Sequence, residues 1–162
     1  MENLSRDLLK ELFEYKDGQL FWKSKPHPRI DISKPAGSMR KDGYVQILIK
    51  RKAYRAHRLV FLMRHGYLPQ EIDHIDGNPS NNAIENLRPA THSQNQHNVG
   101  KRKNNTSGYK GVNWDKALKK WRAKIRINGK RKHLGYFDCP KEAHSAYCQA
   151  ANELHQQYAN FG

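Results

Sequence analysis

The sequence has little cysteine, no long apolar run and few acidic residues, and each shortage excludes a class of protein. Cys139 and Cys148 are the two cysteines among 162 residues, too few for a disulfide framework and not spaced as Cys-x-x-Cys. No apolar stretch approaches the roughly 20 residues that a membrane-spanning helix needs. The start Met1-Glu2-Asn3-Leu4 lacks the charged segment and apolar block of a signal peptide. We therefore expect a protein of a reducing, intracellular compartment with no membrane partner.

Acidic residues are outnumbered two to one. The chain holds 30 Lys and Arg against 15 Asp and Glu, a formal net charge of +15. Residues 101–135 carry 13 basic residues and one acidic residue, Asp115, whereas the rest of the chain carries 17 and 14. So uneven a surplus indicates a polyanionic partner, and nucleic acid is the default. The alternative is a solvated charged surface. An apolar content of 36% predicts folded modules with modest cores.

The first third of the chain predicts a scaffold of short elements. A helix is expected over residues 4–16, with Ser5 as its N-cap, because leucines recur there at helical spacing. Strands are expected at 19–22 and 44–49, with a hairpin partner at 53–56. His57 then opens an apolar helix that ends at Gly66 in the C′ position. We interpret His57 as structural, although cations at the hairpin tip, residues 50–52, could also touch phosphate.

The stretch from Asp73 to Asn98 carries the chemistry. An acid and a histidine end a short apolar run, a turn rich in glycine and asparagine follows, and then come a second strand and the start of a helix. A neutral imidazole can take a proton from water because its pKa lies near neutrality. A hard cation such as Mg²⁺, bound by few protein oxygens, can stabilise the pentavalent phosphate. The layout suits a one-metal phosphodiester hydrolase, and the alternative is an Asx-rich turn before a capped helix.

These residues resemble an HNH (His-Me finger) endonuclease, closest to the phage and intron-encoded homing branch, in which asparagine replaces the last histidine. The matching motifs are Asp73-His74-Ile75-Asp76-Gly77-Asn78, Asn81-Asn82, Asn86-Leu87-Arg88 and Asn95-Gln96-His97-Asn98. The resemblance spans roughly residues 54–98 and implies a ββα-metal fold. It also implies that His74 is the general base and that Asp73 and Asn95 bind one Mg²⁺ (or Mn²⁺). Asn86 would tie the loop between the strands and orient the histidine.

Three further residues rank below these four. His97 and Asn98 lie within one helical turn of Asn95 and could support the site. Arg88 fits either a contact with the scissile phosphate or a structural ion pair. We interpret Asn81 and Asn82 as turn residues.

The basic segment near the C-terminus predicts a small sheet with one charged face. In residues 119–127 apolar side chains alternate with Arg122, Lys124 and Arg126, which places the cations on one face of a strand. Asn128-Gly129 predicts a type I′ turn, and residues 109–114 and 130–137 complete a three-stranded antiparallel sheet. A helix with Asp138 as N-cap should cover the apolar face. The open face could enter the major groove.

This segment resembles the Apetala2-type (ethylene-response-factor) DNA-binding domain. The matching residues are Gly111-Val112, Trp121-Arg122-Ala123-Lys124-Ile125-Arg126, Leu134-Gly135-Tyr136-Phe137 and Ala150-Ala151. The resemblance places the DNA-contacting positions of the sheet on Asn113, Lys124, Arg126, Arg131 and His133. Asn113, Lys124 and His133 stand where plant members have arginine, glutamate and tryptophan, so the target sequence is not inherited. Arg122 and Lys132 are further candidates for phosphate contacts.

Together these patterns predict an α+β protein. Its parts would be an N-terminal α/β region (1–53), a ββα-metal nuclease core (54–99), a basic linker (100–107) and an Apetala2-type domain (108–162) with a three-stranded sheet on one helix. We expect it to cut double-stranded DNA as a monomer in the cytoplasm of a bacterial or phage-infected cell. A double-strand break would need a dimer or two sequential nicks. The alternatives are a non-catalytic DNA-binding regulator and, less favoured by the sheet pattern, an RNA-binding protein.

Overall fold

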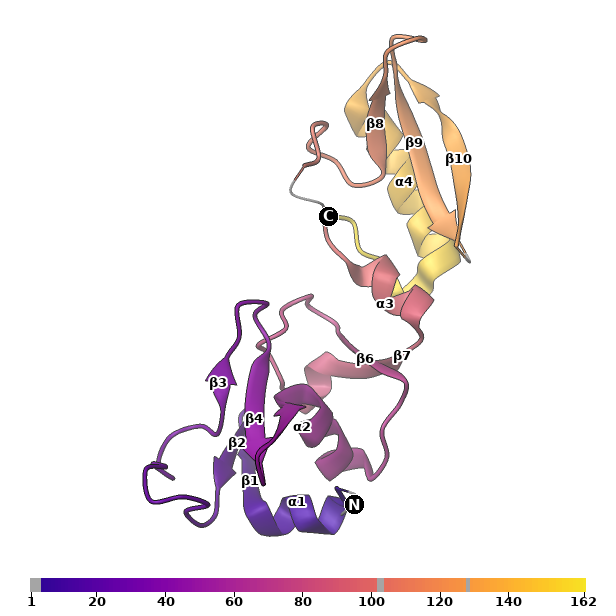
Figure 1. Ribbon diagram of the computed structural model, residues 1–162. Helices are drawn as coiled ribbons and strands as arrows, with labels where there is room; N and C mark the ends of the chain where they lie inside the picture. Colours follow the sequence, from indigo (N-terminus) through magenta and orange to yellow (C-terminus); the bar gives the residue numbers. More distant parts are fainter. Residues whose placement is uncertain (1–3, 102–103, 128) are drawn as a thin grey trace. The chain divides into compact units, whose positions relative to one another are not determined.

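The computed structural model describes residues 4–101, 104–127 and 129–162. Contacts divide the chain into two compact units, Met1–Ala90 and Thr91–Gly162. The first unit contains helices and three small antiparallel sheets, and the second contains helices and one such sheet (Figure 1), which confirms the predicted α+β class. No helix in these described ranges is long and apolar enough to cross a membrane.

The first unit combines two α-helices with three small antiparallel sheets, β1–β2, β3–β4–β5 and β6–β7. Along the chain its elements are α1 (Arg6–Leu12), β1 (Phe13–Lys16), β2 (Gln19–Trp22), β3 (Ser38–Met39), β4 (Val45–Ile49), β5 (Lys52–Arg55), α2 (Ala56–His65), β6 (Glu71–His74), the 3-10 turn η1 (Ile84–Asn86) and β7 (Leu87–Ala90).

The first helix is shorter than predicted. Ser5 caps α1 as expected, since its hydroxyl accepts from the backbone N–H of Leu8 at 3.1 Å. The prediction of helix up to residue 16 is wrong, because Phe13–Lys16 pairs with β2 instead. Phe13 is fully buried and its ring lies 4.2 Å, between centroids, from that of Trp22. An apolar residue at position 13 fits both the spacing of a helix and the alternation of a strand. Packing against the partner strand therefore decides that a strand forms here.

One hydrophobic core runs through the whole first unit. Helix α2 ends at Gly66 in the left-handed conformation, as predicted, with φ of 80°. Its apolar face and that of α1 pack against all three sheets, and Ile72 of β6 and Leu87 of β7 belong to the same cluster. The β6–β7 hairpin is therefore held by the same core as the N-terminal elements. The buried side chains include Leu9, Phe13, Leu20, Trp22, Ile47, Leu59, Val60, Phe61, Ile72 and Leu87.

The second unit consists of α3 (His92–Asn98), β8 (Val112–Asp115), β9 (Lys120–Ile127), β10 (Lys130–Phe137), α4 (Pro140–His155) and the short 3-10 turn η2 (Gln156–Tyr158). The sheet order is β10–β9–β8, and α4 packs on its apolar face, as predicted. The predicted N-cap Asp138 is wrong, since Cys139 occupies that position and Pro140 begins the helix. Of the predicted Asn128-Gly129 turn, Asn128 lies outside the described residues.

Candidate nuclease site and nucleic-acid interface

Asp73 forms a buried ion pair across the β6–β7 hairpin. It lies directly opposite Arg88 in the strand register. Arg88 donates from Nε and Nη2 to Oδ2 of Asp73, at 2.8 and 2.6 Å. The side chains are 4% and 13% exposed, so both charges are largely removed from water. Arg88 therefore fills the ion-pair role that the sequence left open.

His74 occupies the other face of the strand, because adjacent residues of a strand point in opposite directions. Its Nε2 lies 3.2 Å from Oδ1 of Asn82, and both residues are buried. Its ring meets the rings of His57 and Tyr44, with centroids 5.1 and 5.9 Å away. The amide oxygen of Asn82 and the two neighbouring rings therefore help to hold the imidazole in place.

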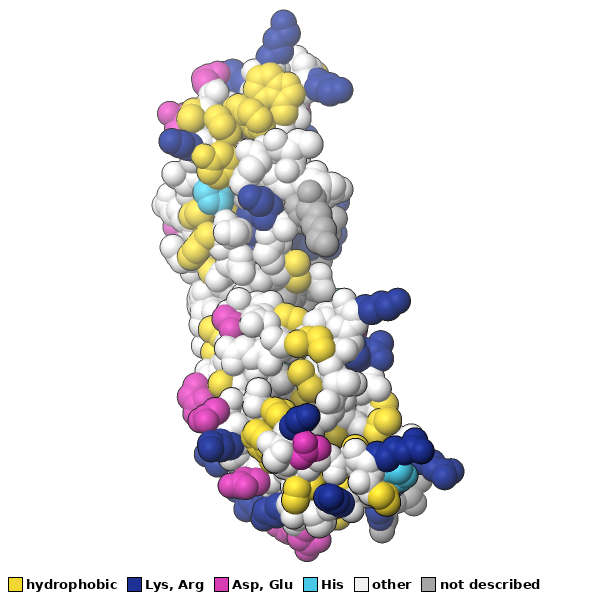
Figure 2. Space-filling view, turned by 90° about the vertical axis from the view of Figure 1, so that its left-hand side faces the viewer, with side chains coloured by type: hydrophobic (Ala, Val, Ile, Leu, Met, Phe, Trp, Pro, Cys, Tyr) yellow, Lys and Arg dark blue, Asp and Glu magenta, His cyan; other side chains and the backbone are white. Residues whose placement is uncertain are grey.

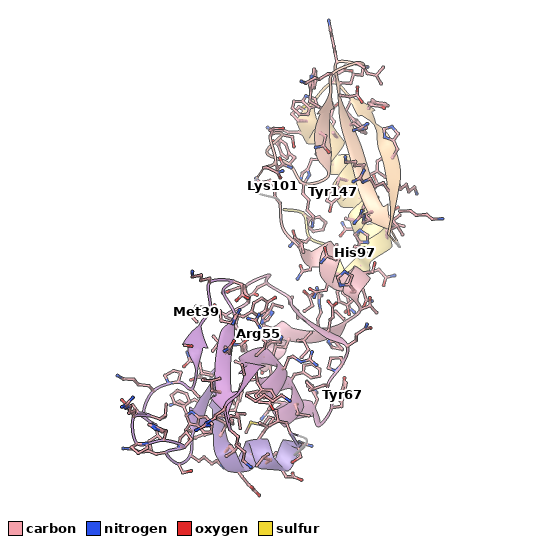
Figure 3. The ribbon with its side chains drawn as sticks, in the orientation of Figure 1. Met39, Arg55, Tyr67, His97, Lys101 and Tyr147 are labelled. Atoms are coloured by element: carbon pink, nitrogen blue, oxygen red, sulfur yellow. The ribbon has the colours of Figure 1, made fainter. Side chains whose placement is uncertain are left out.

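His57 and Tyr44 are themselves fixed in place. Burial lowers the pKa of His57 to about 3, so its ring is neutral near pH 7. The guanidinium of Arg55, which Figure 3 labels, lies 4.7 Å from the centroid of the Tyr44 ring. Arg55 also donates two hydrogen bonds to Asp42 and lowers the pKa of that carboxyl to about 2. Two rings that are themselves held in place, those of His57 and Tyr44, therefore flank the imidazole of His74.

The loop between β6 and β7 is tied together by Asp76 and Asn86. Asn86 accepts from the backbone N–H of Asp76 at 3.0 Å and donates to its carboxylate at 2.9 Å and to Asn81 O at 2.8 Å. Burial alone would raise the pKa of Asp76, but hydrogen bonds from Asn78, Asn81 and Asn86 outweigh it and lower the pKa. Asn86 ties this loop, whereas the atom in contact with Nε2 of His74 is Oδ1 of Asn82, a residue that the sequence interpretation had assigned to the turn.

Helix α3 carries Asn95, His97 and Asn98 within the second unit. It begins with a capping box, in which Thr91 and Gln94 bond to each other's backbone N–H groups. Its last turn is fastened to the end of α4, since the ring of His97 (Figure 3) stacks on that of His155 at 3.6 Å. Asn160 donates to Asn98 O at 2.8 Å. His97 and Asn98 therefore have structural partners, and the half-buried Asn95 lies one turn away from them.

The donor chemistry of the predicted ligands fits a hard divalent cation. Asp73 offers a carboxylate oxygen and Asn95 an amide oxygen, the ligand types that Mg²⁺ prefers. In the part of the chain that the structure describes, no three His, Cys, Asp or Glu side chains gather as a metal site. A cation bound by two protein oxygens would take its other ligands from water and phosphate.

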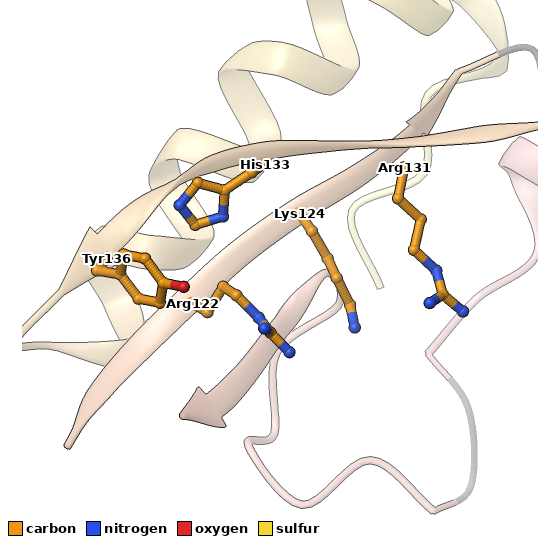
Figure 4. A pocket seen from close by; sticks show the side chains of 5 residues that line it. All are labelled: Arg122, Lys124, Arg131, His133 and Tyr136. Carbon is orange, nitrogen blue, oxygen red and sulfur yellow. The ribbon is translucent and has the colours of Figure 1, made fainter. Parts of the chain in front are cut away.

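The second unit presents a row of cations on the open face of its sheet. Cross-strand partners share a face, and the register pairs Arg126 with Arg131, Lys124 with His133, and Asn113 with Arg122. Lys132 pairs with the core residue Ile125, so it lies on the opposite face. A pocket of about 330 Å³ opens on the cationic face (Figure 4), lined by Arg122, Lys124, Arg131, His133 and Tyr136.

Tyr136 of this pocket is a residue that sequence reasoning missed. The register shifts between His133 and Gly135, and beyond that irregularity Tyr136 pairs with Arg122. Strict alternation from Arg131 and His133 would have placed residue 136 on the covered face. The bulge turns it outward. A glycine inside the strand was the one signal available.

Acidic residues in the described part of the second unit compensate the charges of this face only in part. Arg122 forms an ion pair with Asp115 at 3.4 Å, yet its buried Nε has no hydrogen-bond partner among the described residues. Burial lowers the pKa of Lys124, and the neighbouring Arg122 and Arg131 lower it further. Residues 91–162 carry 14 Lys and Arg against 4 Asp and Glu. On the side drawn in Figure 2, most acidic side chains lie over the first unit. A polyanion would relieve this repulsion.

Comparisons with known proteins match both regions of the chain that hold these residues. The family profile described as HNH endonuclease matches residues 54–97, and the AP2 domain profile matches residues 107–157. The chain belongs to the HNH endonuclease family and carries a C-terminal AP2 DNA-binding domain. It is 39% identical over 112 residues to Protein 3.8 of Escherichia phage T7, a match that covers 68% of this chain and 92% of that protein. No solved structure matches.

Proposed function

We propose that this protein is a metal-dependent DNA endonuclease of the homing type, which hydrolyses phosphodiester bonds at sites selected by its AP2 domain. The observation that carries the proposal is the setting of His74. A buried imidazole bonded to Asn82 at 3.2 Å, one residue from a buried carboxylate, ends strand β6 of an HNH hairpin.

In the proposed reaction His74 takes a proton from water as the water attacks the scissile phosphorus. The bond to the 3′ oxygen breaks, which leaves 5′-phosphate and 3′-hydroxyl ends. A Mg²⁺ or Mn²⁺ ion bound through Asp73 and Asn95 would supply positive charge to the departing oxygen. Asn86 holds the loop that carries Asn82, and Arg88 orients the carboxylate of Asp73.

The AP2 domain would supply most of the affinity and the choice of site. Its sheet face offers Asn113, Lys124, Arg126, Arg131 and His133 to base edges and phosphates, with Arg122 and Tyr136 beside them. Lys132 would reach only a phosphate beyond the sheet edge. We propose the functional divisions 1–53, 54–99, 100–107 and 108–162, double-stranded DNA as the partner, a monomeric protein and the phage-infected bacterial cytoplasm as the compartment.

A second candidate function is a DNA-binding regulator that keeps the HNH fold as a scaffold. The ion pair from Arg88 to Oδ2 of Asp73 favours it, because a carboxylate already neutralised by a guanidinium binds a cation less strongly. A supercoiled-plasmid nicking assay with Mg²⁺ and with excess EDTA separates the two. Nicking that EDTA abolishes supports the endonuclease. Tight DNA binding without nicking, under Mg²⁺ and under Mn²⁺, contradicts it and supports the regulator.

A further inference from the structure

Two aromatic side chains lie together on the cationic face of the second unit. The rings of His133 and Tyr136 are 4.6 Å apart between centroids and tilted by 52°. Tyr136 is 41% exposed, and both residues line the pocket of about 330 Å³. The family resemblance assigned a DNA contact to His133 but none to Tyr136. The ring pair therefore adds an apolar surface to a face that carries mainly cations.

A bulge in β10 places the two rings side by side. His133 pairs with Lys124, and after the shift in register Tyr136 pairs with Arg122, two residues away along β9. Residues two apart on a strand share a face, so the partners of Lys124 and Arg122 also lie on one face. Tyr136 thus fills the place beside His133 that even alternation would give to Gly135.

Beside the rings, the pocket offers hydrogen-bond donors. Arg122 and Lys124 line it from β9, and Figure 4 shows their charged ends next to each other, with the two rings at the other end of the pocket. Both side chains donate hydrogen bonds and cannot accept them. The neighbouring Arg122 and Arg131 add to the burial that lowers the pKa of Lys124, so a further donor would be unfavourable here. The pocket therefore combines an apolar wall with a demand for an acceptor.

Thymine is the base whose major-groove edge combines the two groups that this pocket would contact. It presents an acceptor, O4, beside its C5 methyl group. Guanine presents two acceptors and no methyl group, cytosine presents a donor, and adenine presents an acceptor and a donor. Donors beside apolar rings therefore match thymine better than the other three bases.

We propose that Tyr136 is a specificity-determining residue, which together with His133 packs on the C5 methyl group of a thymine while Arg122 or Lys124 donates to O4. This inference rests on the proposed function for its partner, double-stranded DNA. It adds a base preference at a position where the resemblance supplies none, and it concerns binding rather than cleavage.

The first experiment is selection from a randomised duplex library by the full-length protein in excess EDTA. Sequences bound by the wild type should share a position at which thymine predominates. Tyr136→Ala should lose the preference at that position and keep the others, whereas Tyr136→Phe keeps the ring and should keep the preference. A wild type that prefers thymine at no position overturns the inference.

The second experiment replaces that thymine by uracil, which removes only the C5 methyl group. The wild-type Kd, measured by fluorescence anisotropy in EDTA, should rise roughly fourfold, the loss expected for one buried methyl group. Tyr136→Ala should bind the two duplexes equally. Arg126→Ala, on the same face, is the matched control: it should bind both more weakly and keep the fourfold ratio. Equal wild-type Kd values for the two duplexes overturn the inference even if Tyr136→Ala fails to fold.

Two further outcomes separate the thymine contact from other roles of this protein. Tighter binding to the separated strand than to the duplex would mean that the rings stack on unpaired bases, and would overturn the thymine contact. A protein that shows the fourfold ratio but never nicks DNA in Mg²⁺ or Mn²⁺ refutes the endonuclease and supports the thymine contact.

Discussion

Removing Arg88 should destabilise the first unit far more than removal of a surface cation. In the Arg88→Ala variant, the carboxylate of Asp73 would remain buried without the two N–H donors that reach Oδ2 at 2.6 and 2.8 Å. Breaking a buried ion pair from one side costs about 3–5 kcal/mol, because an uncompensated charge remains. A typical domain is stable by only about 5–15 kcal/mol. We therefore expect loss of a large share of the free energy of unfolding.

Urea denaturation followed by tryptophan fluorescence can isolate this unit. Of the three tryptophans, Trp22 lies in the first unit and Trp114 and Trp121 lie in the second. In a background with Trp114→Phe and Trp121→Phe, the buried Trp22 reports on the first unit alone. The Arg88→Ala transition should move to a much lower urea concentration with an unchanged slope.

A double-mutant cycle and a surface control complete the test. Arg88→Met combined with Asp73→Asn should cost much less than the sum of the single changes, since neither charge is left unpaired. Lys34→Ala breaks the exposed pair with Asp31 and should leave the transition in place. An Arg88→Ala loss below about 1 kcal/mol, the value of a surface pair, would refute the reasoning.

Three further predictions concern pH, salt and packing. Burial holds the pKa of His57 at about 3, below the ordinary 6.5, so the folded state binds fewer protons than the unfolded state. The stability of the protein should therefore fall as the pH drops from 6.5 toward 3. This group should cost about 2 kcal/mol between pH 7 and pH 5, and His57→Gln should flatten that slope in urea melts. Arg126→Ala should lower the slope of log Kd against log salt by roughly 0.9 in fluorescence anisotropy, whereas Lys141→Ala, on α4, should not. In thermal melts, Gly111→Ala should destabilise the second unit by about 1–3 kcal/mol more than Gly108→Ala. Both glycines have a positive φ, but only at Gly111 would an added Cβ overlap the ring of Tyr147.

The parts of the fold that follow local periodicity could be predicted from the sequence. The alternation in residues 119–127 predicts β9 and its two faces, and Gly66 predicts the end of α2. The strand β1 could not be separated from α1, because its place depends on the partner Trp22 rather than on its own pattern. Local sequence signals determine which face of a strand is apolar and where a helix ends. Contacts between residues that are distant in the sequence determine whether an ambiguous segment forms a helix or a strand.

The candidate site shows the same division. The family resemblance assigned roles to Asp73, His74, Asn86 and Asn95, and these assignments remain predictions. It gave no sign of the ring contacts that Tyr44 and His57 make with His74. Nothing in the pair Asn81-Asn82 tells which side chain turns inward to His74. Tyr136 likewise depends on a bulge that the alternation does not contain. Side chains that support a reactive group come from separate segments, so their roles emerge only once the chain is folded.

The proposed function assigns DNA cleavage to His74 and recognition of the DNA site to the sheet of the AP2 domain. The most direct test is the His74→Ala variant, with nicking of supercoiled plasmid and Kd for the same DNA measured in parallel. We expect nicking in Mg²⁺ to be lost while Kd stays at the wild-type value, because the substitution leaves the cationic face of the sheet unchanged. A His74→Ala protein that nicks at the wild-type rate would contradict it.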